Sequence, residues 1–120
     1  APSVAQWAGI AALQNGWDEV ARMRQIYDTR RQLLVQGLRD LGFPIAVEPK
    51  GAFYVFTSCA HIDADDYRLA FDILEKTGVA VTPGRDFGPG GHGFLRFSYC
   101  NSRQNIELAL TRLKDYLAGR

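Results

Sequence analysis

The sequence has little of the composition that marks several large classes of protein. It holds only two cysteines, Cys59 and Cys100, in 120 residues, which excludes a disulfide-dense scaffold. They form neither a CxxC pair nor the spacing of a zinc site. We interpret both as free, buried, reduced thiols of a cytoplasmic protein, and a disulfide between them is the less favoured alternative.

Strong charge and long apolar runs are also missing. The formal net charge is +1 and no basic run exceeds two residues (Arg30-Arg31), so nothing predicts binding to nucleic acid or to an anionic membrane. No segment reaches the roughly 18 consecutive apolar residues that a membrane helix needs. The first 15 residues are fairly apolar but carry no basic start, so they are not a secretory signal.

What is present predicts one domain with an ordinary core, since 47% of the residues are hydrophobic. A short helix is predicted over residues 4–13, ended by Asn15-Gly16. Asp18 is expected to cap a helix that runs to Leu41, and its 24 residues would span about 36 Å. That length predicts a link to a second body, and a start without Met in a helix-rich region suggests a piece of a longer protein.

Two more helices follow from capping residues and periodicity. Asp63 or Asp65 is expected to cap a helix that ends before Gly78, and Ser102 to cap the last one. The predicted apolar faces consist, in the first of these helices, of Tyr67, Ala70, Phe71 and Leu74 and, in the last, of Ile106, Ala109, Leu110, Leu113 and Leu117.

Strands are predicted over residues 45–48, 51–57, 79–82 and 94–99, the first as an edge strand because prolines flank it. The resulting order of elements predicts an α+β fold. Its small, mostly antiparallel or mixed sheet carries helices on one side and is preceded by a long inter-domain helix.

Arg96 is the most informative residue because it lies in the apolar run Phe94-Leu95-Arg96-Phe97-Ser98. In a strand it shares one face with Phe94 and Ser98, opposite Leu95 and Phe97. A guanidinium there is costly to bury without a partner, and it is a planar set of donors that matches a carboxylate. Arginines on sheets more often reach solvent or pair with a structural acid, and Asp86 is a candidate partner of that kind.

Three segments then stand in a distinctive order: PKGAFYVF over residues 49–56, GVAVTPGRDFG over 78–88 and GFLRFSY over 93–99. Together they resemble the C-terminal small domain of class I/II aminotransferases, the aspartate aminotransferase-like, fold-type I enzymes that use pyridoxal 5'-phosphate. The resemblance implies that residues 1–17 are the tail of the cofactor-domain region, 18–41 the linking helix and 42–120 the small domain.

The resemblance also implies functions for single residues. Arg96 would bind the α-carboxylate of an amino acid or 2-oxo acid, and Arg85 and Phe87 would lie in a loop at the substrate entrance. No catalytic residue is expected in these 120 residues, because neither Lys50 nor the other two lysines, Lys76 and Lys114, lies in a motif like that of the family's cofactor lysine. The parent enzyme would be a cytoplasmic homodimer whose cofactor domain precedes this piece.

Two interpretations of function therefore stand side by side. The first is a piece of a pyridoxal-phosphate-dependent aminotransferase, inactive alone, with lyases and decarboxylases as relatives that share the small domain and with the amino donor left open. The second is a stand-alone α+β module that binds an amino acid without catalysis.

A metal site is the weaker interpretation of one acidic cluster, which consists of Cys59, His61, Asp63, Asp65 and Asp66. Its spacing fits no zinc or calcium pattern, so we interpret the aspartates as the cap and first turn of a helix and predict no metal.

Overall fold

The computed structural model describes all 120 residues. Its elements are α1 (Ser3–Asn15), α2 (Trp17–Asp40), β1 (Tyr54–Ser58), α3 (Asp66–Thr77), β2 (Thr82–Pro83), the 3₁₀ turns η1 (Gly84–Phe87) and η2 (Pro89–Gly91), β3 (Phe94–Ser98) and α4 (Arg103–Ala118). None of the helices combines the length and the apolar character that crossing a membrane requires.

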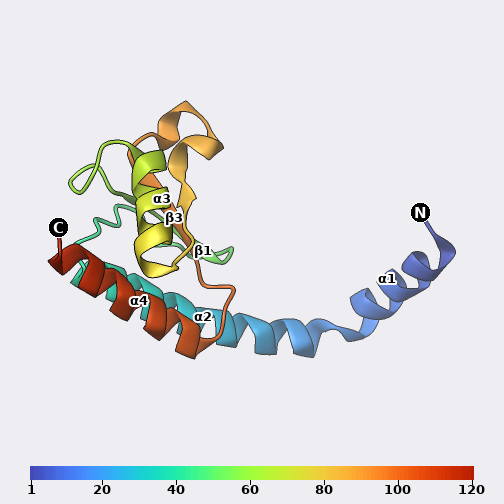
Figure 1. Cartoon of the computed structure of the whole chain (residues 1–120). Coiled ribbons are helices and arrows are strands. Elements are labelled where there is room, and N and C mark those ends of the chain that lie inside the picture. Colours follow the sequence, from blue (N-terminus) through green and yellow to red (C-terminus); the bar gives the residue numbers. More distant parts are fainter.

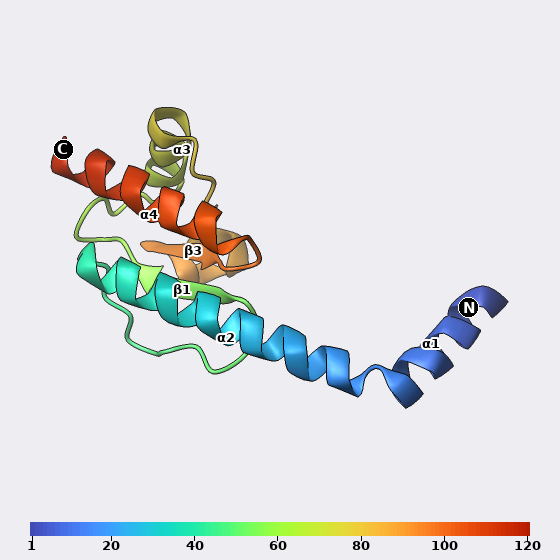
Figure 2. The same ribbon diagram turned by 90° about the horizontal axis from the view of Figure 1, so that it is seen from below.

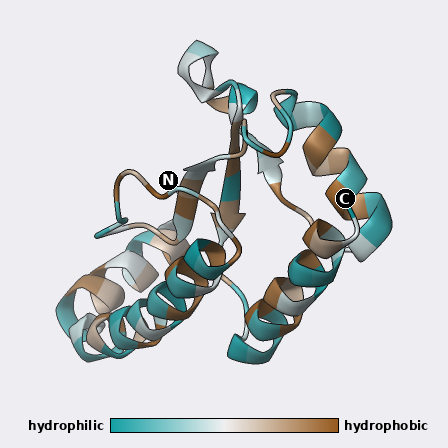
Figure 3. Cartoon of the chain, turned by 90° about the vertical axis from the view of Figure 1, so that its left-hand side faces the viewer, coloured by the Kyte–Doolittle hydropathy of each residue, from teal (hydrophilic) through white to brown (hydrophobic).

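The main body has two layers, which confirms the predicted α+β class. A three-stranded antiparallel sheet in the order β1-β3-β2 carries α2, α3 and α4 on one face (Figures 1 and 2). The core lies between these layers, where the inward residues of the strands meet the helices (Figure 3). The buried hydrophobic side chains of these elements are Val55, Leu95 and Phe97 from the strands and Leu34, Val35, Leu38, Leu69, Ala70, Ile73, Ile106, Leu113 and Tyr116 from the helices.

The first helix and the start of the second project away from this body (Figure 1). A single residue, Gly16, separates α1 from α2, and a Cβ there would stand 2.5 Å from the carbonyl oxygen of Ala12. No residue of α1 is buried, and the apolar residues Val20 and Met23 of α2 are 46% and 41% exposed. The first buried residue of α2 is Leu34, and Tyr27 packs on the edge of the core, so the first turns of this helix lie outside the core.

The capping predictions are confirmed at two helices and wrong at one. Asp65 accepts hydrogen bonds from the backbone N–H groups of Tyr67 and Arg68, and Ser102 accepts one from Asn105. Asp18 is not a cap, because α2 already begins at Trp17 after Gly16. Its carboxylate lies in the first turn, where the helix dipole favours negative charge.

The predicted edge strand at residues 45–48 does not form. Glu48 instead forms ion pairs with Arg31 and Arg39 of α2, at 2.8 and 2.9 Å. The buried hydroxyl of Thr57 donates a hydrogen bond to the carbonyl of Pro44 at 2.7 Å. Side chains therefore hold this segment beside the sheet, where a proline at each end would weaken a ladder.

The other strands are shorter than predicted. The β1 ladder begins only at Tyr54, because Ala52 has a positive φ of 56° that interrupts extended backbone. The strand predicted over residues 79–82 pairs with β3 only at Thr82 and Pro83. Next to it, the N–H of Val79 bonds the hydroxyl of Thr77, so this end of the segment is held by the end of α3.

The apolar face predicted for α3 is confirmed at Ala70 and wrong at its other three residues. Its buried apolar residues are Leu69, Ala70 and Ile73, whereas Tyr67, Phe71 and Leu74 are 39%, 56% and 42% exposed. Both sets have helical spacing, so periodicity alone did not distinguish them. Gly78 ends the helix at a φ of 70°, as a C-terminal glycine is expected to do.

Candidate carboxylate-binding site

Arg96 lies at the middle of the central strand, on the face of the sheet that the helices leave open. It pairs in register with Phe56 of β1 on one side and with Thr82 of β2 on the other. Leu95 and Phe97 point into the core, so the predicted alternation of faces along β3 is confirmed.

The guanidinium of Arg96 has no acidic partner. It forms no ion pair, and its one hydrogen bond runs from Nη2 to the hydroxyl of Thr82 at 3.3 Å. The Nε atom is buried and has no hydrogen-bond partner. An unsatisfied buried donor costs roughly 1–3 kcal/mol, more when it is charged. The half-buried guanidinium therefore has donors available for an anion.

Aromatic rings surround this charge. The Cζ atom of Arg96 lies 5.3 Å from the ring centre of Tyr54 and 4.6 Å from that of Phe87. Phe56 packs its ring edge-to-face on Phe87 at 6.1 Å and stacks on Phe94 at 5.0 Å. Each such cation–ring contact contributes about 0.5–2 kcal/mol, more where water is excluded. The rings hold the guanidinium without neutralising it.

Asp86 does not act as the structural partner of Arg96. Its carboxylate accepts a hydrogen bond from the hydroxyl of Tyr67 at 2.8 Å, and this bond raises the pKa of Tyr67. The alternative in which Arg96 is neutralised within the chain therefore finds no support in the structure.

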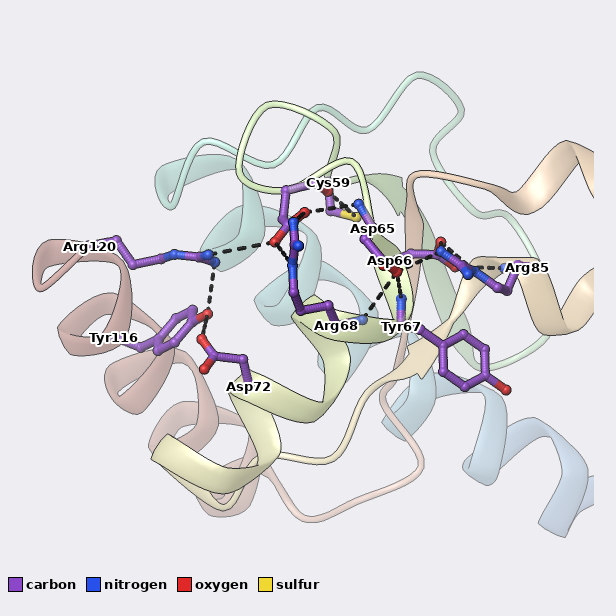
Figure 4. A network of polar contacts seen from close by, with 10 residues as sticks. Cys59, Asp65, Asp66, Tyr67, Arg68, Asp72, Arg85, Tyr116 and Arg120 are labelled. Atoms are coloured by element: carbon purple, nitrogen blue, oxygen red, sulfur yellow. Dashed lines mark hydrogen bonds and ion pairs between the residues drawn. The ribbon is translucent and has the colours of Figure 1, made fainter.

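The structure places the two predicted entrance residues differently. Phe87 is 52% exposed and stacks on Arg96. The guanidinium of Arg85 points instead to the start of α3, where it bonds Asp66 at 2.8 Å and Asp65 at 2.7 Å (Figure 4). A direct contact of Arg85 with substrate stays a prediction, but most of its charge is already matched inside the chain.

The acidic cluster considered as a metal site has partners within the protein. Asp63 forms an ion pair with Arg68, whose hydrogen bond is the main reason that the pKa of Asp63 falls to about 2. Burial acts to raise the pKa of Asp66, but the hydrogen bonds from Arg85 outweigh it and lower that pKa to about 2. These carboxylates thus serve helix capping and ion pairing.

Both cysteines are free, as predicted, but their environments differ. Cys59 is fully buried, and burial raises its pKa to about 11, with the charges of Asp66 and Asp63 adding to the effect. The prediction that Cys100 is buried is wrong. The side chain of Tyr99 points into the core, so that of Cys100, the next residue, faces solvent.

The lysines do not fit a cofactor site on the open face of the sheet. Lys76 lies in α3, where its ammonium pairs with Asp72 at 2.8 Å. Lys50 precedes β1 and Lys114 lies in α4, and both are exposed. Among the residues that surround Arg96 there is therefore no lysine amine that could bond to pyridoxal phosphate.

Sequence reasoning missed two residues of this site. Tyr54 contacts Arg96 because Phe56 pairs with Arg96 in the β1–β3 register, and Tyr54, two residues before Phe56, lies on the same face. Asp66 holds Arg85 across 19 positions of sequence. A known strand register would have indicated Tyr54, whereas no local signal marked Asp66 as more than a first-turn acid.

Comparisons with known proteins agree with this geometry. The family model for aminotransferase class I and II matches residues 1–113. The aspartate/prephenate aminotransferase of Thermus thermophilus is 44% identical over an alignment 120 positions long, which covers 96% of this chain and 30% of that protein. A structure of Thermus thermophilus aspartate aminotransferase with maleate has a TM-score of 0.85 at 43% identity, covering 93% of this chain and 29% of the other.

A second solved structure gives the same result. The aromatic aminotransferase from Pyrococcus horikoshii OT3 has a TM-score of 0.83 at 36% identity, over 87% of this chain and 28% of that one. The fold and the open-face arginine thus define a segment of an aminotransferase. The chain belongs to the class I and II aminotransferase family, and it spans about 30% of the length of these relatives.

Proposed function

We propose that this chain is the C-terminal part of a pyridoxal-phosphate-dependent aminotransferase, in which Arg96 binds the α-carboxylate of an amino acid or a 2-oxo acid. In this proposal residues 1–17 belong to the cofactor-domain region, 18–41 link the domains and 42–120 form the small domain. The observation that carries this proposal is the half-buried guanidinium of Arg96, which has unused donors and pairs with no Asp or Glu of this chain.

The arrangement suits a carboxylate for electrostatic reasons. A carboxylate accepts two parallel hydrogen bonds from a guanidinium, and the pair gains strength where rings exclude water. Two parallel bonds also set the orientation of the substrate's Cα, which transamination requires. Pyridoxal phosphate, when bound, supplies the electron sink for that reaction, while Arg96 supplies the orientation.

The proposal requires that the reacting groups lie outside these residues, since no lysine of this chain stands beside Arg96. We therefore expect the 120-residue chain alone to show no transaminase turnover when pyridoxal phosphate, an amino acid and a 2-oxo acid are added. Turnover above the rate of free pyridoxal phosphate would contradict the proposal that the reacting groups lie outside these residues. A homodimeric, cytoplasmic enzyme stays a prediction from the family resemblance.

The direct test is Arg96→Lys in the enzyme that contains this chain. The change keeps the positive charge but removes the planar donor pair, so kcat/KM should fall by the equivalent of roughly 2–4 kcal/mol. Arg103→Lys is the matched control, because the side chain of Arg103 is 62% exposed and pairs only with Glu107 on the same helix.

The competing interpretation makes Arg96 a purely structural residue, or the chain an amino-acid-binding module without catalysis. A structural arginine would lower the free energy of unfolding in Arg96→Lys and leave KM nearly unchanged. A non-catalytic module would be encoded by a gene with no lysine-bearing cofactor domain. Either result would refute the proposal.

A further inference from the structure

An ion pair with a buried carboxylate connects the start of α3 to the loop that carries Phe87. The carboxylate of Asp66 is fully buried, and it accepts hydrogen bonds from both the backbone N–H and the Nε of Arg85, at 2.9 and 2.8 Å (Figure 4). Arg85 also bonds Asp65 at 2.7 Å and lies over the ring of Tyr67 at 5.1 Å. This single arginine thus joins the loop to the helix by backbone and side chain together.

The loop closes tightly on itself. Gly84 and Gly91 pass so near each other that a Cβ on Gly84 would stand 2.2 Å from the carbonyl oxygen of Gly91. Both glycines are buried, and the N–H of Gly91 bonds the carbonyl of Gly88 at 2.9 Å. A loop closed in this way has little freedom of its own, so its placement depends on what holds it to the domain.

Phe87 is the residue by which this loop reaches the open face. Its ring lies 4.6 Å from the Cζ of Arg96, closer than the ring of Tyr54 at 5.3 Å. Tyr54 belongs to the β1–β3 ladder and is fixed by the sheet. Phe87 lies outside the ladder: Phe56 packs on its ring edge-to-face, and its backbone is placed by a loop that Asp66–Arg85 and Tyr67–Asp86 bonds join to α3. The Asp66–Arg85 contact is the buried one of these two links, so it has the larger effect on where the ring lies.

The guanidinium of Arg96 depends on these rings for its orientation. No acid holds it, its Nε has no partner and its single hydrogen bond is long at 3.3 Å. Removing one ring would therefore leave it free to rotate, and a mobile guanidinium loses entropy when it binds a carboxylate. Placement of Phe87 is thus a requirement for a donor pair that is oriented before the substrate arrives.

We propose that Asp66 and Arg85 are positioning residues, which hold Phe87 against Arg96 so that its guanidinium is oriented for a carboxylate. The inference deepens the proposed function and rests on it. It also changes the predicted function of Arg85, which acts on the substrate site through the loop rather than by contact with the substrate.

The first test measures the orientation itself, without any activity. NMR order parameters of the arginine Nε–H groups are recorded in the 120-residue chain, and Arg96 is assigned by its loss in Arg96→Lys. We expect Arg96 to be as rigid as ordered backbone, near about 0.85, and to fall below about 0.6 in Asp66→Asn. Phe87→Leu should have the same effect, and Phe87→Tyr should retain the rigid signal.

Asp63→Asn is the matched control, because Asp63 is a carboxylate near the start of the same helix that pairs with Arg68 and Arg120 rather than with Arg85. It should leave the Arg96 signal unchanged. An Arg96 that stays rigid in both Asp66→Asn and Phe87→Leu would overturn the inference, as would equal loosening in Asp63→Asn. If Asp66→Asn does not fold, Phe87→Leu and Phe87→Tyr decide the question.

The second test separates the inference from the proposed function. In the enzyme that contains this chain, Asp66→Asn should raise KM about tenfold with little change in kcat, because the carboxylate is held alike in the ground and transition states. If KM stays normal in Asp66→Asn while kcat/KM falls in Arg96→Lys, the inference is overturned and the proposed function stands. If kcat/KM is unchanged in Arg96→Lys, the proposed function is refuted. The NMR order parameters would still decide whether Asp66 positions Arg96.

Discussion

The buried carboxylate of Asp66 makes a quantitative prediction about acid stability. Its pKa falls from 3.8 to about 2 in the folded chain because hydrogen bonds from Arg85 outweigh the effect of burial. A folded pKa below the unfolded one means that the stabilisation is present above pH 4 and is lost as the pH falls through 2. The shift corresponds to about 2 kcal/mol, of which about 1 kcal/mol should be gone at pH 3.

The variant Asp66→Asn isolates this contribution. An amide cannot become an anion, so it should destabilise the chain by at least about 2 kcal/mol at pH 7 and by about 1 kcal/mol less at pH 3. The neighbouring thiol of Cys59 does not interfere, because its raised pKa keeps it neutral below pH 7. Asp65 is next to Asp66 and also accepts a hydrogen bond from Arg85, so Asp65 is kept as aspartate in every sample.

Urea unfolding followed by far-UV circular dichroism at pH 7, 4.5 and 3 measures the difference between the two chains. Asp86→Asn is the control, since Asp86 bonds the hydroxyl of Tyr67 and makes no ion pair with Arg85; it should change stability by no more than about 0.5 kcal/mol. A difference between wild type and Asp66→Asn that stays constant from pH 7 to pH 3 would refute the assigned cause of the pKa shift.

Two further predictions concern the core and the exposed apolar residues of α1 and the start of α2. Leu38→Ala removes a fully buried side chain of α2 and should cost about 2–5 kcal/mol in urea unfolding, whereas Val20→Ala, at a position 46% exposed, should cost little; equal effects would show that the first half of α2 packs in solution. The exposed apolar side chains Trp7, Leu13 and Trp17 should cause the 120-residue chain to self-associate as its concentration rises, and serine at these three positions should abolish the association in sedimentation velocity. A wild-type chain that stays monomeric at all concentrations would contradict this reasoning.

Much of the local structure followed from the sequence alone. Asp65 and Ser102 cap their helices because short polar side chains satisfy the first free N–H groups, and Gly78 ends α3 because glycine tolerates a positive φ. The alternation around Arg96 follows from the period of a strand, whatever the strand packs against. Such signals act between neighbours a few residues apart, so the sequence expresses them directly.

The tertiary structure decided which of several compatible surfaces is used. Helix α3 has two stripes of helical spacing, and packing against the sheet and α4 buried Leu69 and Ile73 rather than Phe71 and Leu74. Residues 45–48 did not join the sheet, because prolines flank them on both sides, and Glu48 pairs with Arg31 and Arg39 of α2 instead.

The same distinction applies to the candidate site. The sequence determined that an arginine stands in the middle of an apolar strand, and the resemblance to the family predicted that it binds a carboxylate. Only the tertiary structure decided that no acid reaches Arg96, that Phe87 lies on it and that Asp66 holds the loop in place. These contacts join residues far apart in the chain, and their geometry exists only after the sheet, α3 and the loop have closed on one another.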